Sequence, residues 1–331
     1  MGSNPATPTI RFPVCCVSVY LPENINALKI YDYLMKPFDY LLYGLTVFAW
    51  STSWLPLKWQ LGVVAPEVSI FWRFLIAGIL MMGFAIWRGE NLRLPIAIHF
   101  RIAMLSLFLF SCNFTMFYYG GLGVSSGLLA VVFSTASLMV LIIKSSLDRE
   151  WPQFQLIIAV IFGISGVSLI FLPEISYGHA PLISLMFCLI GTLIFSLGNI
   201  LSGRLQSRKI SVITANSWGM LYGSAFLAMF SLMRGHSFMV ELTWKYMGGL
   251  AWLSTVSSVM AFTCYLTLVG RIGPGRASYI TVIFPVVALF ISQRTESYQW
   301  TLFSIIGLIL VIAGNTIMAR STPKQIPEPK Q

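Results

Sequence analysis

Charged side chains are scarce in this sequence. Asp, Glu, Lys and Arg together make up 10% of its 331 residues, whereas hydrophobic residues make up 57% and the mean hydropathy is +0.80. A soluble domain carries roughly 25% charged residues, because it needs them to cover its surface. The composition therefore excludes a soluble protein and predicts an integral membrane protein.

The sequence also lacks common catalytic and metal-site motifs. It contains no HExxH motif and no P-loop, and no pair of carboxylates falls inside an apolar run. Its five cysteines show no metal-ligand spacing, and three of them stand within apolar segments as small hydrophobic residues. We therefore expect no enzymatic activity, no metal and no other cofactor.

The net charge of +10 does not indicate nucleic-acid binding. The Lys and Arg residues are scattered in groups of one to three between apolar runs and form no basic stripe. Such a distribution is typical of the charges that set membrane topology. The lipid bilayer is thus the expected surrounding, with no nucleic acid as partner.

Ten apolar segments follow one another along the chain, each near the roughly 20 residues that a bilayer core requires. Short connections with Pro or Gly separate them. Together they predict an all-α membrane protein with ten transmembrane helices, at approximately 40–58, 67–87, 98–119, 124–143, 153–172, 181–203, 211–232, 246–269, 276–292 and 300–319.

The distribution of Lys and Arg predicts the orientation of these helices. With the N-terminus inside, the inner segments carry sixteen of the 21 basic residues, and Arg73 lies within the membrane. The outer segments carry four, namely Lys58, Arg234, Lys245 and Arg294. Because positive charge favours the cytoplasmic side, we predict that both termini are cytoplasmic.

The two halves of the chain resemble each other, which predicts an internal repeat. An offset of 148 residues places Phe114, Thr115, Phe117, Gly127 and Gly166 on Phe262, Thr263, Tyr265, Gly275 and Gly314. Each repeat holds five predicted helices, and because five is odd, the second repeat enters the membrane from the opposite side. Inverted repeats of this kind place a substrate site near the bilayer midplane, between the halves.

The stretch from Trp50 to Arg73 carries a resemblance to a known family. Trp50 and Ser51 stand in the first apolar helix, Lys58 ends it, Pro66 lies in the short link, and Arg73 lies inside the second helix. This pattern resembles the first helix pair of EamA-type transporters of the drug/metabolite transporter superfamily. The resemblance implies two tandem EamA units and a transport function.

The resemblance and the repeat together predict four parts of the chain. We expect a flexible cytoplasmic tail over 1–37, a first repeat with helices one to five over 38–173, a second repeat with helices six to ten over 174–319, and a disordered cytoplasmic tail over 320–331.

Aromatic and polar side chains inside the apolar segments are candidates for a substrate site. They are Trp50, Trp54, Arg73, Asn113, Phe117, Ser134, Asn199, Phe262 and Tyr265. Six of these nine residues have a simpler alternative. The tryptophans could form an interfacial belt, the asparagines could link helices, Ser134 could bond back to its own helix, and Arg73 could extend to the outer surface. The resemblance favours a functional Arg73 that holds a carboxylate or a neighbouring helix end.

The predicted function is export of small polar metabolites by alternating access about a central cavity. The resemblance gives the direction and the leading substrate class, amino acids including aromatic ones. Open alternatives are a non-transporting structural or receptor-like bundle, and a transporter of nucleosides, vitamins or drugs. We expect a monomer or weak homodimer in the cell inner (plasma) membrane.

The placement of acidic residues predicts how transport is driven. All eleven lie in tails, loops or helix ends, and the three histidines lie near loops. Asp39 and Glu67 stand at helix starts, where a negative charge suits the helix dipole. Arg73, the charge at depth, cannot release a proton at cellular pH. We therefore expect facilitation driven by the substrate gradient.

The ten-helix orientation predicts where reporter domains will lie. A reporter fused at Gly178 should report the outer side of the membrane, and one fused at the C-terminus should report the cytoplasm, because five helices separate them. Paired phosphatase and fluorescent-protein fusions measure this directly. The same side for both fusions would contradict the ten-helix inverted arrangement.

Overall fold

The computed structural model describes residues 36–149, 151, 154–175, 179–277, 280–281, 283–296 and 298–320. Most of both predicted tails lies outside these ranges. Within them every regular element is helical and no strand occurs. The predicted all-α class is therefore confirmed for the part of the chain that is described.

The first half contains straight helices and helices built from consecutive pieces. Its elements are α2 (Pro37–Ser51), α3 (Trp54–Trp59), α4 (Pro66–Trp87), α5 (Ile96–Ser106), the π-helix η1 (Leu107–Cys112), α6 (Asn113–Gly120), α7 (Ser126–Phe133), α8 (Ala136–Asp148) and α9 (Phe154–Ile175). α2 and α3 are separated at Thr52 and Ser53, whose hydroxyls donate to backbone carbonyls one turn earlier. Such bonds compete with the helical ladder and bend the chain.

The second half repeats this order. It contains α10 (Ala180–Gln206), α11 (Val212–Met233), α12 (Trp244–Trp252), the π-helix η2 (Leu253–Met260), α13 (Ala261–Ile272), α14 (Pro274–Ala277), α15 (Phe284–Thr295) and α16 (Leu302–Arg320). The π-helix η2 interrupts the eighth predicted segment as η1 interrupts the third. The fourth and ninth segments are each divided into two helices, α7 with α8 and α14 with α15. Both irregularities recur in the corresponding segments of the two halves.

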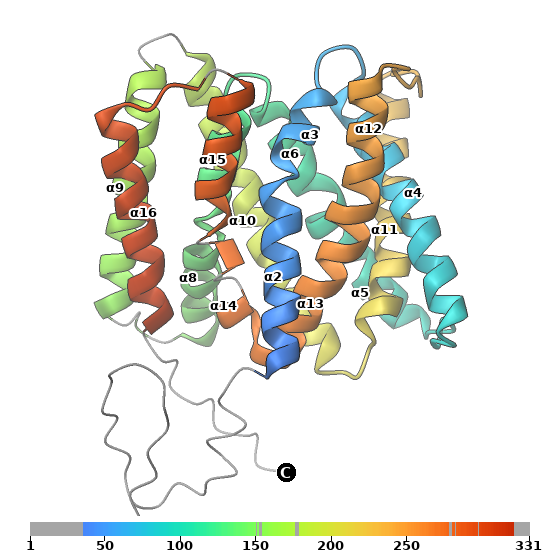
Figure 1. Ribbon diagram of the computed structural model, residues 1–331. Coiled ribbons are helices and arrows are strands. Elements are labelled where there is room, and N and C mark those ends of the chain that lie inside the picture. Colours follow the sequence, from blue (N-terminus) through green and yellow to red (C-terminus); the bar gives the residue numbers. More distant parts are fainter. Residues whose placement is uncertain are drawn as a thin grey trace, which may run out of the picture. The chain divides into compact units, whose positions relative to one another are not determined.

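The core forms where the two halves meet. Many helix pairs join one helix from each half, among them α9 with α16, α4 with α11, α6 with α10, α7 with α15, and α2 with α13. Figure 1 shows the pair α9–α16 at one edge of the bundle and α4 towards the other, with α2 between them. Residues on α2 thus lie in the middle of the bundle.

Glycines allow the closest of these contacts. A Cβ atom on Gly307 of α16 would lie 2.5 Å from the carbonyl oxygen of Gly166 on α9. Gly223 on α11 lies against Phe110 in the same way, with 2.7 Å between an added Cβ and the Phe110 Cβ. A larger side chain at either position would force the helices apart.

Within the described ranges, six helices are long and apolar enough to cross a membrane: 66–87, 96–120, 126–148, 154–175, 180–206 and 244–272. A shorter apolar helix covers 302–317. Large apolar side chains such as Ile86, Ile161 and Ile309 are exposed on the outside of the bundle, as expected for a surface that contacts lipid. Every predicted segment overlaps at least one helix, whereas the count of ten crossings and the orientation of the termini stay predictions.

Candidate functional site

Trp50, near the end of α2, is the centre of an aromatic cluster. Its ring centroid lies 4.7 Å from that of Tyr265 and between 5.7 and 6.4 Å from those of Phe133, Phe195, Phe262 and Phe284. These rings come from α7, α10, α13 and α15, so five helices from both halves meet at one tryptophan. Trp50 is 5% exposed, which places it in the core and not in an interfacial belt.

A small cavity of about 40 Å³ adjoins this cluster. Six of the nine predicted site residues line it: Trp50, Trp54, Arg73, Asn113, Phe117 and Phe262. The structure thus brings them together around one space at the interface between the halves. Seven further residues complete the lining, among them Ser53, Phe133, Phe195 and Ser257.

Arg73 contributes a buried positive charge to this cavity. Its side chain is 1% exposed, so it does not extend to the outer surface. The guanidinium donates from Nε to the Ser258 hydroxyl at 2.9 Å and from an Nη atom to the Ser257 hydroxyl at 3.0 Å. It also lies 4.3 Å from the centre of the Phe114 ring, where the ring face attracts a cation.

Neutral groups therefore solvate the Arg73 charge. The ion pairs found among the described residues involve Arg234, His236 and Arg271, and none of them involves Arg73. A buried cation without a counter-ion is unfavourable by several kcal/mol. An anionic group that entered the cavity would relieve this cost.

Two further polar atoms at the cavity are buried without a hydrogen-bond partner in the described part of the chain. They are the indole Nε1 of Trp54, a donor, and the amide Oδ1 of Asn113, an acceptor. Buried polar groups in folded proteins are almost always bonded. Their position beside Arg73 gives the cavity one more free donor and one free acceptor.

The remaining three predicted residues do not line the cavity. The Asn199 amide donates to the Tyr265 hydroxyl at 2.5 Å, a bond that links α10 to α13 directly beside Trp50. The Ser134 hydroxyl bonds back to the Val131 carbonyl at 2.6 Å. Asn199 thus links helices, and Ser134 caps the end of α7, as their simpler alternatives predicted.

At one end of the bundle, called here the Glu67 end, a buried carboxylate joins residues of both halves. The Glu67 carboxylate is fully buried and accepts from Arg234 at 3.2 Å and from the Tyr119 hydroxyl at 3.0 Å, with His236 Nδ1 at 3.1 Å. Lys58 donates to the carbonyls of Gly121 and Val124. The bonds of Glu67, Tyr119 and Arg234 tie α4 and α6 to the end of α11, across the two halves, and the bonds of Lys58 tie α3 to the turn after α6.

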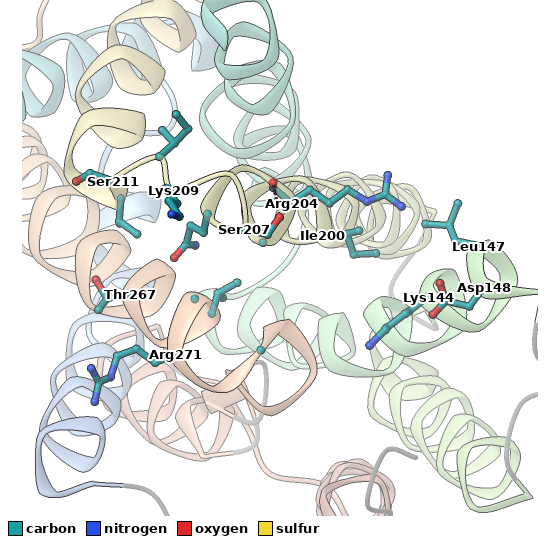
Figure 2. Close-up of a pocket in the computed structure, with 17 residues that line it drawn as sticks. Lys144, Leu147, Asp148, Ile200, Arg204, Ser207, Lys209, Ser211, Thr267 and Arg271 are labelled. Carbon is teal, nitrogen blue, oxygen red and sulfur yellow. Dashed lines mark hydrogen bonds between the residues drawn. The ribbon is translucent and has the colours of Figure 1, made fainter. Parts of the chain in front are cut away.

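The opposite end, called here the Asp39 end, contains an ion pair between Asp39 on α2 and Arg271 on α13. A cavity of about 750 Å³ opens beside it, lined by residues of α8, α10, α13 and the turn after α10. Figure 2 shows Lys144, Arg204, Lys209, Thr267 and Arg271 around this space. The sequence interpretation that the helix dipole accounts for Asp39 and Glu67 is incomplete, because each pairs with an arginine of the second half.

A metal site has no candidate ligands here: within the described ranges, no three His, Cys, Asp or Glu side chains are grouped as ligands.

The model of the EamA-like transporter family matches the chain twice, over residues 38–172 and 182–320. The chain belongs to the EamA-like transporter family. The two matches confirm the predicted EamA resemblance and its extent across both halves.

Relatives of this EamA protein support the same assignment. It is 25% identical over 301 residues to Protein PagO of Salmonella typhimurium, covering 86% of this chain and 94% of the relative. It is 24% identical over 284 residues to an uncharacterized transporter of Archaeoglobus fulgidus, covering 85% and 98%. A solved crystal structure superposes with a TM-score of 0.62 at 14% identity, over 86% of this chain and 96% of that one, and shows the shared fold.

Sequence reasoning missed the partners of the predicted residues in this EamA bundle. Ser257 and Ser258 hold Arg73 from a distance of 184 and 185 positions, and nothing local marks them. Phe133 and Phe195 occupy apolar positions that any helix core could contain. Two features of the sequence could have indicated the Glu67–Arg234 pair. Glu67 follows Pro66 directly at the start of an apolar segment, and Arg234 is the basic residue just after the predicted segment 211–232.

The Glu67 network predicts a stability effect. Glu67→Gln should lower the melting temperature of the purified protein, because losing the charged partner of Arg234 and Tyr119 costs about 1–3 kcal/mol. Arg234→Gln should act in the same direction, and the double variant should lose less than the sum. Glu90→Gln, at the other end of α4, is the control. If Glu67→Gln and Glu90→Gln lowered the melting temperature equally, the bonds of Glu67 would not be a specific source of stability.

Proposed function

We propose that this EamA protein exports small polar metabolites, with amino acids, aromatic ones included, as the leading substrate class. It moves its substrate unchanged, and acts as a monomer or weak homodimer in the cell inner (plasma) membrane. Both termini lie in the cytoplasm, so the Asp39 end faces inward and the Glu67 end outward. The two halves act as inverted repeats around the central cavity.

The observation that carries this proposal is Arg73 in the aromatic cavity. A guanidinium binds a carboxylate through two parallel hydrogen bonds, and the cavity offers it without a counter-ion among the described residues. Trp54 and Phe117, whose ring centroids lie 5.5 Å apart, suit an apolar or aromatic side chain. A carboxylate joined to such a side chain matches both features.

Alternating access accounts for the small volume of the cavity. Sites for small molecules usually measure roughly 300–1,000 Å³, whereas this one measures about 40 Å³. The helices around Trp50 must therefore separate for a metabolite to enter. The wide cavity at the Asp39 end and the bonded Glu67 end support a state closed to the outside, from which the Asp39 end admits substrate.

A non-transporting bundle is the alternative class, and a transporter of nucleosides, vitamins or drugs is the alternative substrate assignment. Family membership favours transport over a structural role. A nucleoside carries no anionic group for Arg73, which favours a carboxylate over that substrate class.

Arg73 predicts a specific loss of transport. In proteoliposomes loaded with phenylalanine, Arg73→Gln should lower the initial rate of labelled phenylalanine exchange at least about 30-fold, the loss typical for one partner of a buried charged pair. Arg73→Lys should retain part of the rate, since it keeps the charge but not the planar pair of donors. Arg88→Gln, exposed at the end of α4, serves as control. Wild-type exchange in Arg73→Gln would refute the proposed site, and absence of exchange in the wild type for every amino acid tested would refute the substrate class.

The placement of acids predicts transport without proton coupling. Glu67 is buried, but it lies in a network with Arg234 and outside the central cavity. With equal phenylalanine on both sides of the liposome membrane, an imposed pH gradient should therefore produce no net movement. Accumulation driven by the gradient alone would contradict facilitation and direct attention to Glu67.

A further inference from the structure

The cavity at the Asp39 end is strongly basic. Four cations line it, namely Lys144 on α8, Arg204 on α10, Lys209 in the turn after α10 and Arg271 on α13, against the single carboxylate of Asp148. Figure 2 shows that they come from different elements around the space. Serine and threonine hydroxyls of the same elements add neutral hydrogen-bonding groups.

Three of these cations form no ion pair with an acidic side chain in the described part of the chain. Arg271 pairs with Asp39, whereas no ion pair found in the described ranges uses the side chain of Lys144, Arg204 or Lys209. Asp148 stands one turn after Lys144 on α8 and forms no ion pair with it. Their charge is therefore available to a ligand, and like charges around one space attract anions to it.

This cavity and the aromatic cluster around Trp50 lie along the same two helices, α10 and α13. Arg204 is five residues beyond Asn199 on α10, about 7.5 Å along a helix axis. Thr267, also in the lining, is two residues beyond Tyr265 on α13. Tyr265 belongs to the aromatic cluster around Trp50, and its bond to Asn199 joins the two helices that also line the basic cavity.

We propose that the basic cavity is a loading site for the carboxylate of the substrate, which then passes to Arg73. This inference rests on the proposed transport function and extends it. Every charged group that lines the central cavity or stands free in the loading site is positive, apart from Asp148. The carboxylate is therefore the recognised group, and the α-ammonium of an amino acid is dispensable. Aromatic carboxylic acids without an amino group are substrates of the same path.

The same charges are compatible with two simpler roles. Basic residues at this end also set the topology, and an anionic lipid headgroup carries the same chemistry as a carboxylate. Arg208 separates the topological role from the proposal, because it is exposed in the same turn but does not line the cavity. We propose a soluble carboxylate as the ligand, and the experiment below distinguishes it from a lipid headgroup.

Three ligands with one phenyl ring test the proposal on the full-length purified protein. Phenylalanine, 3-phenylpropionate, which lacks the ammonium, and phenethylamine, which lacks the carboxylate, are titrated calorimetrically into nanodiscs of phosphatidylcholine. We expect 3-phenylpropionate to bind at least as tightly as phenylalanine, and phenethylamine at least about tenfold more weakly than either. Both carboxylates should also exchange in proteoliposomes.

Matched variants then locate the loading site. Lys144→Gln and Arg204→Gln should each weaken 3-phenylpropionate binding about fivefold, the effect of one partly exposed charge pair, while Arg208→Gln leaves it unchanged. Equal weakening by Arg208→Gln would show a general charge effect and overturn the site. The measurement is repeated in nanodiscs that contain phosphatidylglycerol. If the variants lose only bound phosphatidylglycerol, detected by native mass spectrometry, and keep 3-phenylpropionate affinity, the cavity is a lipid site and the proposal is wrong.

The outcome for phenylalanine separates this inference from the proposed function. Exchange of phenylalanine with neither binding nor exchange of 3-phenylpropionate would overturn the carboxylate-only rule and leave amino-acid export standing. Failure of both carboxylates in binding and exchange would overturn the proposed substrate class, and the loading site with it.

Discussion

The buried guanidinium of Arg73 is the interaction on which the rest of the structure depends. A charge within an apolar bundle is unfavourable by about 2.5–3.5 kcal/mol even on insertion scales that allow for relaxation. The protein offsets this cost with two hydroxyls, from Ser257 and Ser258, and with the ring face of Phe114. Because these hydroxyls belong to the second half and Arg73 to the first, solvating the charge also joins the halves at the cavity.

Irregular helix geometry positions these groups. Ser257 and Ser258 are consecutive residues of the π-helix η2, where the wider turn presents both hydroxyls to one guanidinium. π-Helical segments occur frequently at functional sites, and η1 stands in the corresponding segment of the first half. The two ends of the bundle differ: a buried carboxylate pairs with Arg234 at the Glu67 end, and four cations line a wide cavity at the Asp39 end. The two ends of the bundle are therefore held together by different interactions.

The helices were largely predictable from the sequence, because apolar runs of membrane-spanning length have few alternatives. The predicted segment 67–87 differs from α4 by one residue at its start. Six of the nine predicted site residues line the central cavity, and they were identifiable because an arginine and tryptophans deep in apolar segments are unusual. The pairing was not: Ser257 lies 184 residues from Arg73, and no local pattern encodes such a contact. The π-helices were not predicted, because a π-helical segment leaves the spacing of apolar residues almost unchanged.

A structure with bound phenylalanine tests the central claim most directly. The account predicts that the carboxylate lies within hydrogen-bonding distance of the Arg73 guanidinium, with the phenyl ring against Trp50 or Trp54 and the cavity enlarged around it. At least one of the bonds from Arg73 to Ser257 and Ser258 should then be exchanged for a bond to the ligand. A ligand bound elsewhere, with Arg73 still bonded to both serines and the aromatic cluster unchanged, would contradict the account.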